Sequence, residues 1–250
     1  MDSAIRRIAA ISDVHGNVWA LEAVLRDITE RGVDVIMNLG DHLYGPLDPI
    51  KTAALLQATP MVNIHGNCDR LLYAEGATSV TMQRNRAELT QPIRDWLRSL
   101  PATRFCSPEI FLCHGTPQHD DVYMLECVHQ RGIVGRRAPE WIAQECEGIY
   151  ASLILCGHSH LPGELRLVND RTVVNPGSVG LPAYTHETPL PHAMRSGSPH
   201  ARYALIERNK THWRVERIEV KYDWDAAAAT AARNGREDWA EWLRTGEART

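Results

Sequence analysis

The residues best suited to chemistry in this chain are aspartates, histidines and an asparagine, each placed just after a short apolar run. Five such places occur, and they hold Asp13 with His15, Asp41, Asn67, His114, and His158 with His160. A glycine stands in or beside each place, where the backbone can turn sharply. Carboxylate and imidazole groups together are typical ligands of divalent transition metals. The residue types therefore indicate a metal site, provided that the fold brings the five places together.

Taken singly, these residues have ordinary structural explanations. Asp13 could cap the helix that follows it, and Asp41 and Asn67 could be turn residues. His114 could be a core histidine bonded to a carbonyl. In each of the two pairs, a spacing of two residues predicts that both side chains project to the same side of an extended strand end. It is the joint occurrence of all seven residues that favours one shared site.

The apolar runs before these residues predict strands that alternate with helices. Residues 5–11 and 33–39 predict buried strands on either side of an amphipathic helix over 17–32, which is a βαβ unit with a parallel strand pair. Further strands are predicted over 61–64, 110–113 and 153–156, and further helices over 48–56, 90–100 and 139–146. Because ligands bind beyond the carboxyl ends of the strands in such sheets, this order brings the polar residues to one edge of the fold.

The rest of the chain predicts antiparallel hairpins and a helical tail. Hairpins are expected at 103–106 with 110–113, at 164–168 with 172–174, and at 202–207 with 213–220. Residues 181–199 have no periodicity, and we expect a long loop there that either covers the site or is solvated surface. From about residue 225 an Ala-rich helix and a second helix around Trp239 are predicted, packed on a single domain that spans residues 1–250.

Length and composition are those of an ordinary globular protein. The chain has 250 residues, of which 44% are hydrophobic and 23% are charged. A net charge of −4 argues against a protein that wraps nucleic acid by bulk electrostatics, so no stable nucleic-acid binding is expected. Twelve histidines against two phenylalanines favour a metalloprotein, since histidine is the commonest transition-metal ligand.

Several features of the sequence bear on the cellular location of the protein. No apolar run of about 18 residues is present, and the N-terminus lacks the apolar region and cleavage site of a secretory signal. The six cysteines are scattered without a C-x-x-C pair, which predicts reduced thiols. We therefore expect a cytoplasmic protein with no membrane partner. The oligomeric state is not predicted.

The complete set of motifs resembles one family. SDVHGN at 12–17, LGD at 39–41, HGNCD at 65–69, CHG at 113–115 and GHSH at 157–160 are similar to the motifs of the calcineurin-like metallophosphoesterase superfamily. NPGSVG at 175–180 resembles a turn in its small prokaryotic members. The resemblance implies an α/β (α+β) fold, a four-layer αββα sandwich of two mixed β-sheets flanked by helices. It also implies a metal site at the carboxyl ends of the strands.

The resemblance further implies two metal ions. One would be held by Asp13, His15, Asp41 and His160, and the other by Asp41, Asn67, His114 and His158. Two ions roughly 3.5–4 Å apart need a shared anion to offset their repulsion, so Asp41 would bridge them and a bridging hydroxide would be the nucleophile. Manganese, iron, cobalt, nickel and zinc all suit such ligands, and we expect manganese to support activity in assays.

Cys68 is a departure from the commonest form of the family, in which a histidine at this position assists the leaving group. A thiol is a poor general acid in its place because it carries no positive charge and has an ordinary pKa near about 8.5. The small phosphodiesterases that the sequence resembles share this Gly-Asn-Cys-Asp form. His65 is a candidate substitute acid, although a structural histidine at a strand end is the simpler interpretation.

These observations favour a dinuclear metal-dependent phosphodiesterase acting on a small phosphoester substrate. One alternative is a phosphomonoesterase that acts on a phosphoprotein or a nucleotide. The alternative from another class is a metal-binding scaffold without catalysis, and the presence of all seven candidate ligands argues against it. The natural substrate is not predicted.

Overall fold

The computed structural model describes residues 5–76, 79–168, 170–210 and 212–249, and two five-stranded sheets form its centre. The first sheet holds, in spatial order, β14 (Trp213–Val220), β13 (Ala201–Arg208), β1 (Arg7–Ile11), β2 (Val35–Asn38) and β3 (Val62–Asn63). The second holds β4 (Arg104–Ser107), β5 (Ile110–Leu112), β8 (Leu153–Leu155), β10 (Thr172–Asn175) and β9 (Gly163–Arg166). Both sheets are mixed, because β1–β2 and β5–β8 are parallel pairs whereas β1–β13 and β10–β9 are antiparallel.

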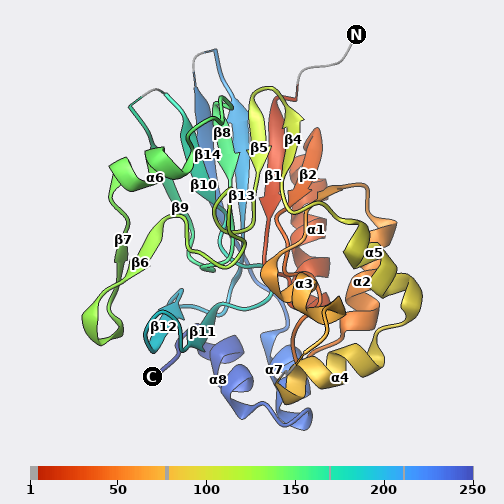
Figure 1. Cartoon of the computed structure of the whole chain (residues 1–250). Coiled ribbons are helices and arrows are strands. Elements are labelled where there is room, and N and C mark those ends of the chain that lie inside the picture. The colour runs from red at the N-terminus through yellow and green to blue at the C-terminus, as the bar shows by residue number, and fades with distance from the viewer. Residues whose placement is uncertain (1–4, 77–78, 169, 211, 250) are drawn as a thin grey trace.

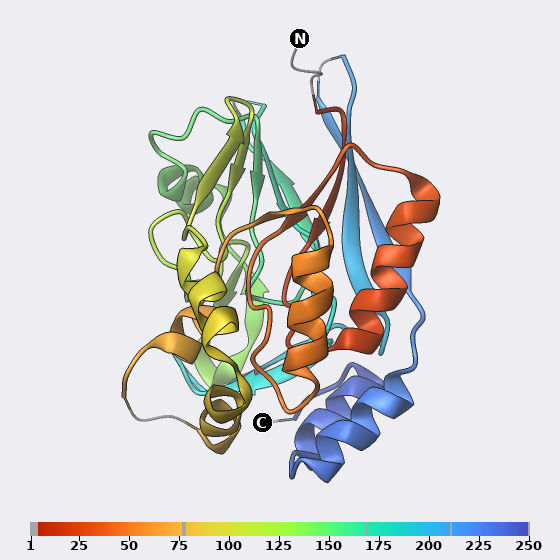
Figure 2. The same ribbon diagram turned by 90° about the vertical axis from the view of Figure 1, so that its right-hand side faces the viewer.

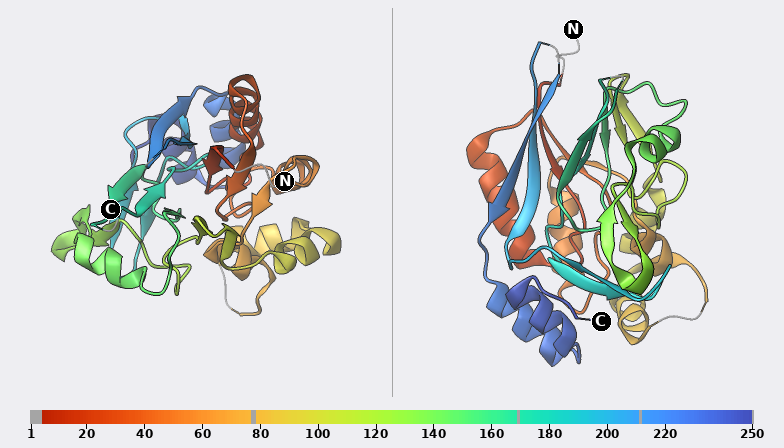
Figure 3. Two further views of the ribbon diagram at one scale, coloured as in Figure 1. Left: turned by 90° about the horizontal axis from the view of Figure 1, so that it is seen from above. Right: turned by 90° about the vertical axis from the view of Figure 1, so that its left-hand side faces the viewer.

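Helices lie outside the two sheets, which face each other (Figures 2 and 3). The helices are α1 (Val18–Arg31), α2 (Pro49–Ala58), α3 (Asn67–Tyr73), α4 (Val80–Glu88), α5 (Gln91–Ser99), α6 (Pro139–Glu145), α7 (Trp224–Arg233) and α8 (Glu237–Thr245). The arrangement confirms the mixed two-sheet architecture with flanking helices that the motifs implied.

Three apolar cores hold these layers together, and the alternation of side chains along β1 explains two of them. Ile8 and Ala10 point between the sheets and pack with residues of the second sheet such as Leu112. Ala9 and Ile11 point the other way, into a core shared with α1 and α7. A third core lies between the second sheet and α6. The first strand is therefore buried on both faces, as its uninterrupted apolar sequence predicts.

The element boundaries follow local capping chemistry. Helix α1 begins where the Asn17 side chain accepts a hydrogen bond from the Ala20 N–H at 3.1 Å, and it ends at Gly32 in a positive-φ conformation. Helix α2 begins in the same way at Asp48, whose carboxylate accepts from the Lys51 N–H at 3.0 Å. Asn17, and not Asp13, is thus the N-cap of α1.

The expected loop over 181–199 is wrong in part, because it contains an antiparallel hairpin of β11 (Ala183–His186) and β12 (His192–Arg195). Each strand has four residues, too few for a period-two pattern to be visible among prolines and histidines. The charged stretch before α6 likewise contains a hairpin of β6 (Glu126–Val128) and β7 (Val134–Arg136), joined by the short turn η1 (Gln130–Gly132).

The C-terminal helices lie where the motifs collect. Both helices and the β11–β12 hairpin lie at the end of the molecule opposite to the N-terminus (Figure 1). Ala227, Ala231 and Leu243 are fully buried and belong to the same core as the outer face of the first sheet. Among the helices in the described ranges, none has the length and apolar character needed to cross a membrane.

The turn at residues 175–180 packs directly against the loop after β1. Gly180 donates a backbone hydrogen bond to the Asp13 carbonyl, and Val179 donates to the Ser12 carbonyl, both at 2.9 Å. A Cβ atom on Gly180 would lie 1.7 Å from the Val14 carbonyl oxygen. No side chain fits there unless the backbone moves.

We expect Gly180→Ala to destabilise the fold by more than about 3 kcal/mol, above the usual range for overpacking, because the clash is with backbone. Gly148→Ala is the control, since Gly148 has a φ of +79° but no atom within 4 Å of its Cβ position. That variant should lose only about 1–2 kcal/mol from the left-handed backbone. Urea unfolding followed by circular dichroism compares the two. Equal losses of unfolding free energy in the two variants would contradict the explanation by a steric clash at Gly180.

Candidate metal centre

The loops that follow β1 and β2 run side by side beyond the ends of these parallel strands. The Asp13 N–H donates to the Gly40 carbonyl and the His15 N–H donates to the Asp41 carbonyl, both at 2.9 Å. These bonds continue the pairing of the strands into the loops. Asp13, His15 and Asp41 therefore lie at adjacent positions on one edge of the sheet, as their place after the strands predicts.

The buried carboxylate of Asp69 connects this edge to the next loop. Its Oδ2 accepts hydrogen bonds from the backbone N–H groups of Asp41 at 2.8 Å and Gly66 at 3.0 Å. The His42 side chain is also bonded to this carboxylate, at 2.6 Å. One side chain thus fixes the loop that carries Asp41 relative to the loop that carries Asn67.

The second sheet delivers His114 and the GHSH turn to the same place. The Gly157 N–H donates to the His114 carbonyl at 2.6 Å, and the Asn175 side chain donates to the Gly157 carbonyl at 2.7 Å. The His158 N–H in turn donates to Asp13 Oδ2 at 3.2 Å. The loops from both sheets are therefore held together by direct hydrogen bonds.

The backbone at the candidate ligands is not extended, which corrects the expectation of strand-like alternation. Five candidates lie in the left-handed region, with φ values of 56° at Asp13, 52° at His15, 56° at Asp41, 68° at His158 and 60° at His160. Such a conformation costs a non-glycine residue about 1–2 kcal/mol, so the hydrogen bonds of the loops must maintain it. The side chains of His158 and His160 therefore do not lie together, and each belongs to a different group of side chains.

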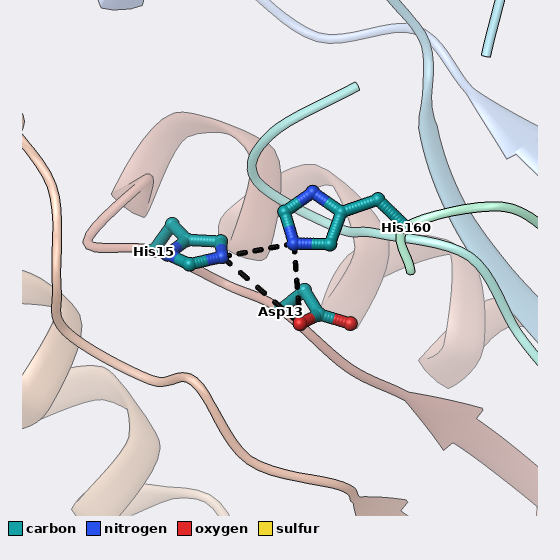
Figure 4. A group of neighbouring side chains, drawn as sticks. All are labelled: Asp13, His15 and His160. Carbon is teal, nitrogen blue, oxygen red and sulfur yellow. Dashed lines mark hydrogen bonds and ion pairs between the residues drawn. The ribbon is translucent and has the colours of Figure 1, made fainter. Parts of the chain in front are cut away.

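The first group consists of Asp13, His15 and His160, whose ligand atoms all lie within 4.8 Å of one another. His15 Nε2 is 3.1 Å from His160 Nε2, and His160 Nε2 is 3.3 Å from Asp13 Oδ1 (Figure 4). All three residues are nearly inaccessible to solvent.

The second group consists of Asp41, His114 and His158. His114 Nε2 lies 3.5 Å from Asp41 Oδ2 and 3.1 Å from Asn67 Oδ1, which places Asn67 beside this group. Asp41 Oδ2 also lies 3.8 Å from His15 Nε2. A single carboxylate oxygen is therefore near a histidine of each group.

The hydrogen bonds behind the histidines determine which nitrogen faces the centre. The Nδ1 atoms of His15, His114 and His160 are bonded to the backbone carbonyls of Tyr44, Leu39 and Leu181 at 2.7–2.8 Å. A carbonyl accepts only from a protonated nitrogen, so in the neutral rings the Nε2 lone pairs point into the centre. Asp13 Oδ1 is buried there without a hydrogen-bond partner. Converging lone pairs and an unpartnered carboxylate oxygen fit a bound cation.

The charged groups of the site shift one another's pKa values. Burial alone would raise the pKa of Asp13, but the nearby His160 and His114 lower it to about 2. Burial likewise opposes ionisation of Asp41, yet His114 above all holds the pKa of this carboxyl well below its usual range. Burial lowers the pKa of His158 to about 3, whereas Asp41 and Asp13 raise that of His114 to about 10 despite its burial. Both aspartates are therefore anionic at neutral pH.

The other two candidate residues occupy different positions. Cys68 lines a cavity of about 420 Å³ together with Asp41, Asn67 and His158, and its backbone N–H donates to Asp41 Oδ1 at 2.9 Å. His65 does not line this cavity. It contributes instead to another hollow, which is lined also by His114, Arg70 and Asp120, so it lies on the other side of His114 from the cavity that Cys68 lines.

Sequence reasoning missed several residues that surround the centre. The ring of Tyr123 stacks on His158 with a centroid distance of 4.7 Å, and the ring of Tyr184 lies 4.5 Å from that of His160. Trp239 of α8 is buried and also lines the cavity with Arg236. No motif marks these positions, although the loop containing Tyr184 was one expected candidate to cover the site.

Comparisons with known proteins agree with the geometry. Residues 7–195 match the model of the calcineurin-like phosphoesterase superfamily domain. An uncharacterized protein of Methanocaldococcus jannaschii is 25% identical over 256 residues, covering 93% of this chain and 94% of the relative. The crystal structure of a metallophosphoesterase from Sphaerobacter thermophilus is also 25% identical, with a TM-score of 0.76 over 97% of this chain and 100% of that one.

The family match extends over most of the chain and includes every candidate ligand, from Asp13 to His160. The two-sheet fold and the clustered aspartates and histidines at the strand ends are consistent with it. This chain belongs to the calcineurin-like phosphoesterase superfamily and is a metal-dependent hydrolase of phosphoric esters.

Proposed function

We propose that this protein hydrolyses phosphodiesters with two divalent metal ions, and that Asp41 is shared between them. The supporting observation is Asp41 Oδ2, which lies 3.8 Å from His15 Nε2 in the first group and 3.5 Å from His114 Nε2 in the second. An anionic oxygen within reach of both groups suits two ions that repel each other at close range. Nitrogen and oxygen ligands of this kind suit manganese, iron, cobalt, nickel or zinc.

When bound, such ions supply a water nucleophile of lowered pKa and positive charge for the phosphate oxygens. The chain's own contribution is to prepare their site. Asp13 and Asp41 are held ionised, and the histidine rings are oriented by the carbonyls behind them. Because these groups are buried, the charges act on the substrate with little screening by solvent.

Cys68 supports a diester substrate over a monoester. Its Sγ lies 3.7 Å from the Asn67 side-chain amide, and burial followed by the Asp41 carboxylate raises the pKa of the thiol well above its usual value. A neutral thiol neither attracts the dianion of a monoester nor protonates a poor leaving group. A diester carries a single negative charge, so it depends less on a positively charged residue at position 68.

The proposed function predicts that purified protein with added Mn²⁺ hydrolyses bis(4-nitrophenyl) phosphate with a higher kcat/KM than 4-nitrophenyl phosphate. Release of 4-nitrophenolate measures both reactions. A preference for the monoester would favour the phosphomonoesterase alternative, and hydrolysis of neither ester with any of the five metals would contradict the proposal.

Replacing the shared carboxylate tests the two-ion centre. Asp41→Asn should reduce kcat/KM for the diester by at least about 100- to 1,000-fold, a loss typical of removing a charge that stabilises the transition state. The bound metal measured by elemental analysis should fall in parallel. Asp95→Asn, at an exposed carboxylate paired with Arg98, should change neither quantity. Full metal content with unchanged activity in Asp41→Asn would refute the shared ligand.

Metal binding should release protons, because His114 has a pKa raised to about 10 in the metal-free site and must lose a proton to become a ligand. His158, with its pKa lowered to about 3, is already neutral at pH 7. We expect about one proton released per protein, and metal affinity should rise about tenfold per pH unit. Titration calorimetry of Mn²⁺ binding in two buffers of different ionisation enthalpy measures the number of protons released per protein. Identical heats in both buffers would contradict this assignment of protons.

Restoring an imidazole next to Asn67 should shift the choice of ester. Cys68→His should raise the ratio of monoester to diester hydrolysis by about tenfold or more, since general acid catalysis contributes on this scale. Cys68→Ala should leave the ratio near that of the native protein, which separates loss of the thiol from gain of the acid. If the histidine variant behaves like the alanine variant, Cys68 lies outside the leaving-group position.

A further inference from the structure

A second cavity lies beside the one that contains the metal centre. It has a volume of about 660 Å³, within the usual range for small-molecule sites, and it shares Asn67, Leu71, His158 and His186 with the first cavity. Since Asn67 and His158 belong to the candidate metal centre, both cavities open on that centre. A phosphoester held at the centre therefore has room for a substituent on either side.

Arg137 gives the second cavity its distinctive chemistry. The residue lies between β7 and α6, and its Nε donates to the Tyr123 carbonyl at 3.4 Å. Its guanidinium lies over the ring of Trp141, with 3.8 Å between the guanidinium carbon and the ring centroid. Two contacts from different segments thus fix the side chain in one orientation. A stacked guanidinium keeps its edge free for bidentate hydrogen bonds to a planar or tetrahedral anion.

In the described part of the chain, Arg137 forms no direct ion pair, although it attracts the buried Glu126, whose carboxylate is paired with Arg136 at 2.6 Å. Across the described ranges, no aspartate or glutamate oxygen lies within ion-pair distance of Arg137. Arg70, the other cation of this cavity, is bound in bidentate fashion by Asp120 with both contacts at 2.8 Å. Asp121 is the acidic residue of the lining, and it is exposed, so water and salt screen its charge. The cavity therefore presents one guanidinium that is held in place and is not engaged in a direct ion pair with any described residue.

We propose that Arg137 binds a second phosphate group of the substrate while the ester at the metal centre is hydrolysed. The inference rests on the proposed function and names a substrate class for it, a phosphodiester that carries a further phosphate. Arg137 does not contact the reacting atoms, so it acts as a specificity-determining residue. Its interaction is the same in the bound substrate and in the transition state, and it should affect KM far more than kcat.

A matched pair of substrates tests this inference. Thymidine 5′-(4-nitrophenyl phosphate) and its 3′-phosphorylated form have the same reacting ester and the same leaving group, and they differ only in the second phosphate. With Mn²⁺, the native protein should prefer the phosphorylated form by about 10- to 100-fold in kcat/KM, the size of a charge-assisted hydrogen bond. Arg137→Ala should lose this preference through a raised KM and retain activity on the form without the 3′-phosphate.

Two further variants separate binding from folding. Arg137→Lys keeps the positive charge but lacks the planar guanidinium, so it should retain part of the preference for the phosphorylated ester. In the native protein and in Arg137→Lys, this preference should weaken as salt is added. Arg104→Ala removes the same charge from an exposed position on β4 and should keep the full preference.

Equal activity of the native protein on the two esters would overturn the inference while leaving the proposed function intact. Equal losses on both esters in Arg137→Ala would show a structural role instead. Hydrolysis of neither ester by the native protein would contradict the proposed function itself.

Discussion

The backbone of the metal centre is held in a costly conformation, and the buried carboxylate of Asp69 is central to holding it. Asp41 lies at a φ of 56°, and the backbone N–H groups of Asp41, His42 and Gly66 all donate to Asp69. Asp69 is fully buried, so leaving these donors without their acceptor would cost far more than one ordinary hydrogen bond. The same side chain connects the loops after β2 and β3. The position of the Asp41 carboxylate therefore depends on a residue that is not itself a candidate ligand.

The same hydrogen bonds make the site unfavourable without a cation. Two aspartates and four histidines occupy a volume from which water is largely excluded, and three of the rings are oriented from behind by carbonyls. A protein can stabilise so many ligand atoms close together either by keeping some of them protonated or by binding a metal ion. The raised pKa of His114 and the lowered pKa of His158 show the first solution in the metal-free chain. A bound metal would replace the proton of His114 with a cation of greater charge.

The two-sheet fold was implied by the resemblance of the motifs, and the clustering of the candidate ligands was predictable from short-range signals. Apolar runs identified β1, β2 and β5, and the polar residues after them were correctly expected at one edge of the sheets. The direction of each side chain was not predictable in the same way. Strand alternation placed His158 and His160 on one face, whereas their positive φ values send them to different groups. That conformation is imposed by hydrogen bonds to distant residues, such as the bond from His158 to Asp13, which no local pattern records.

Other residues that line the two cavities come from different parts of the chain than the candidate ligands. The ligands follow strands, so their order in the chain is tied to the order of the sheets. Arg137 follows a three-residue strand, and Arg236 and Trp239 come from the tail beyond residue 195, where the family match ends. The β6–β7 hairpin and the two terminal helices lie outside both five-stranded sheets. The residues that follow strands of these sheets, Cys68 among them, thus lie at the metal centre, whereas a short hairpin and the terminal helix α8 complete the walls of the two cavities beside it.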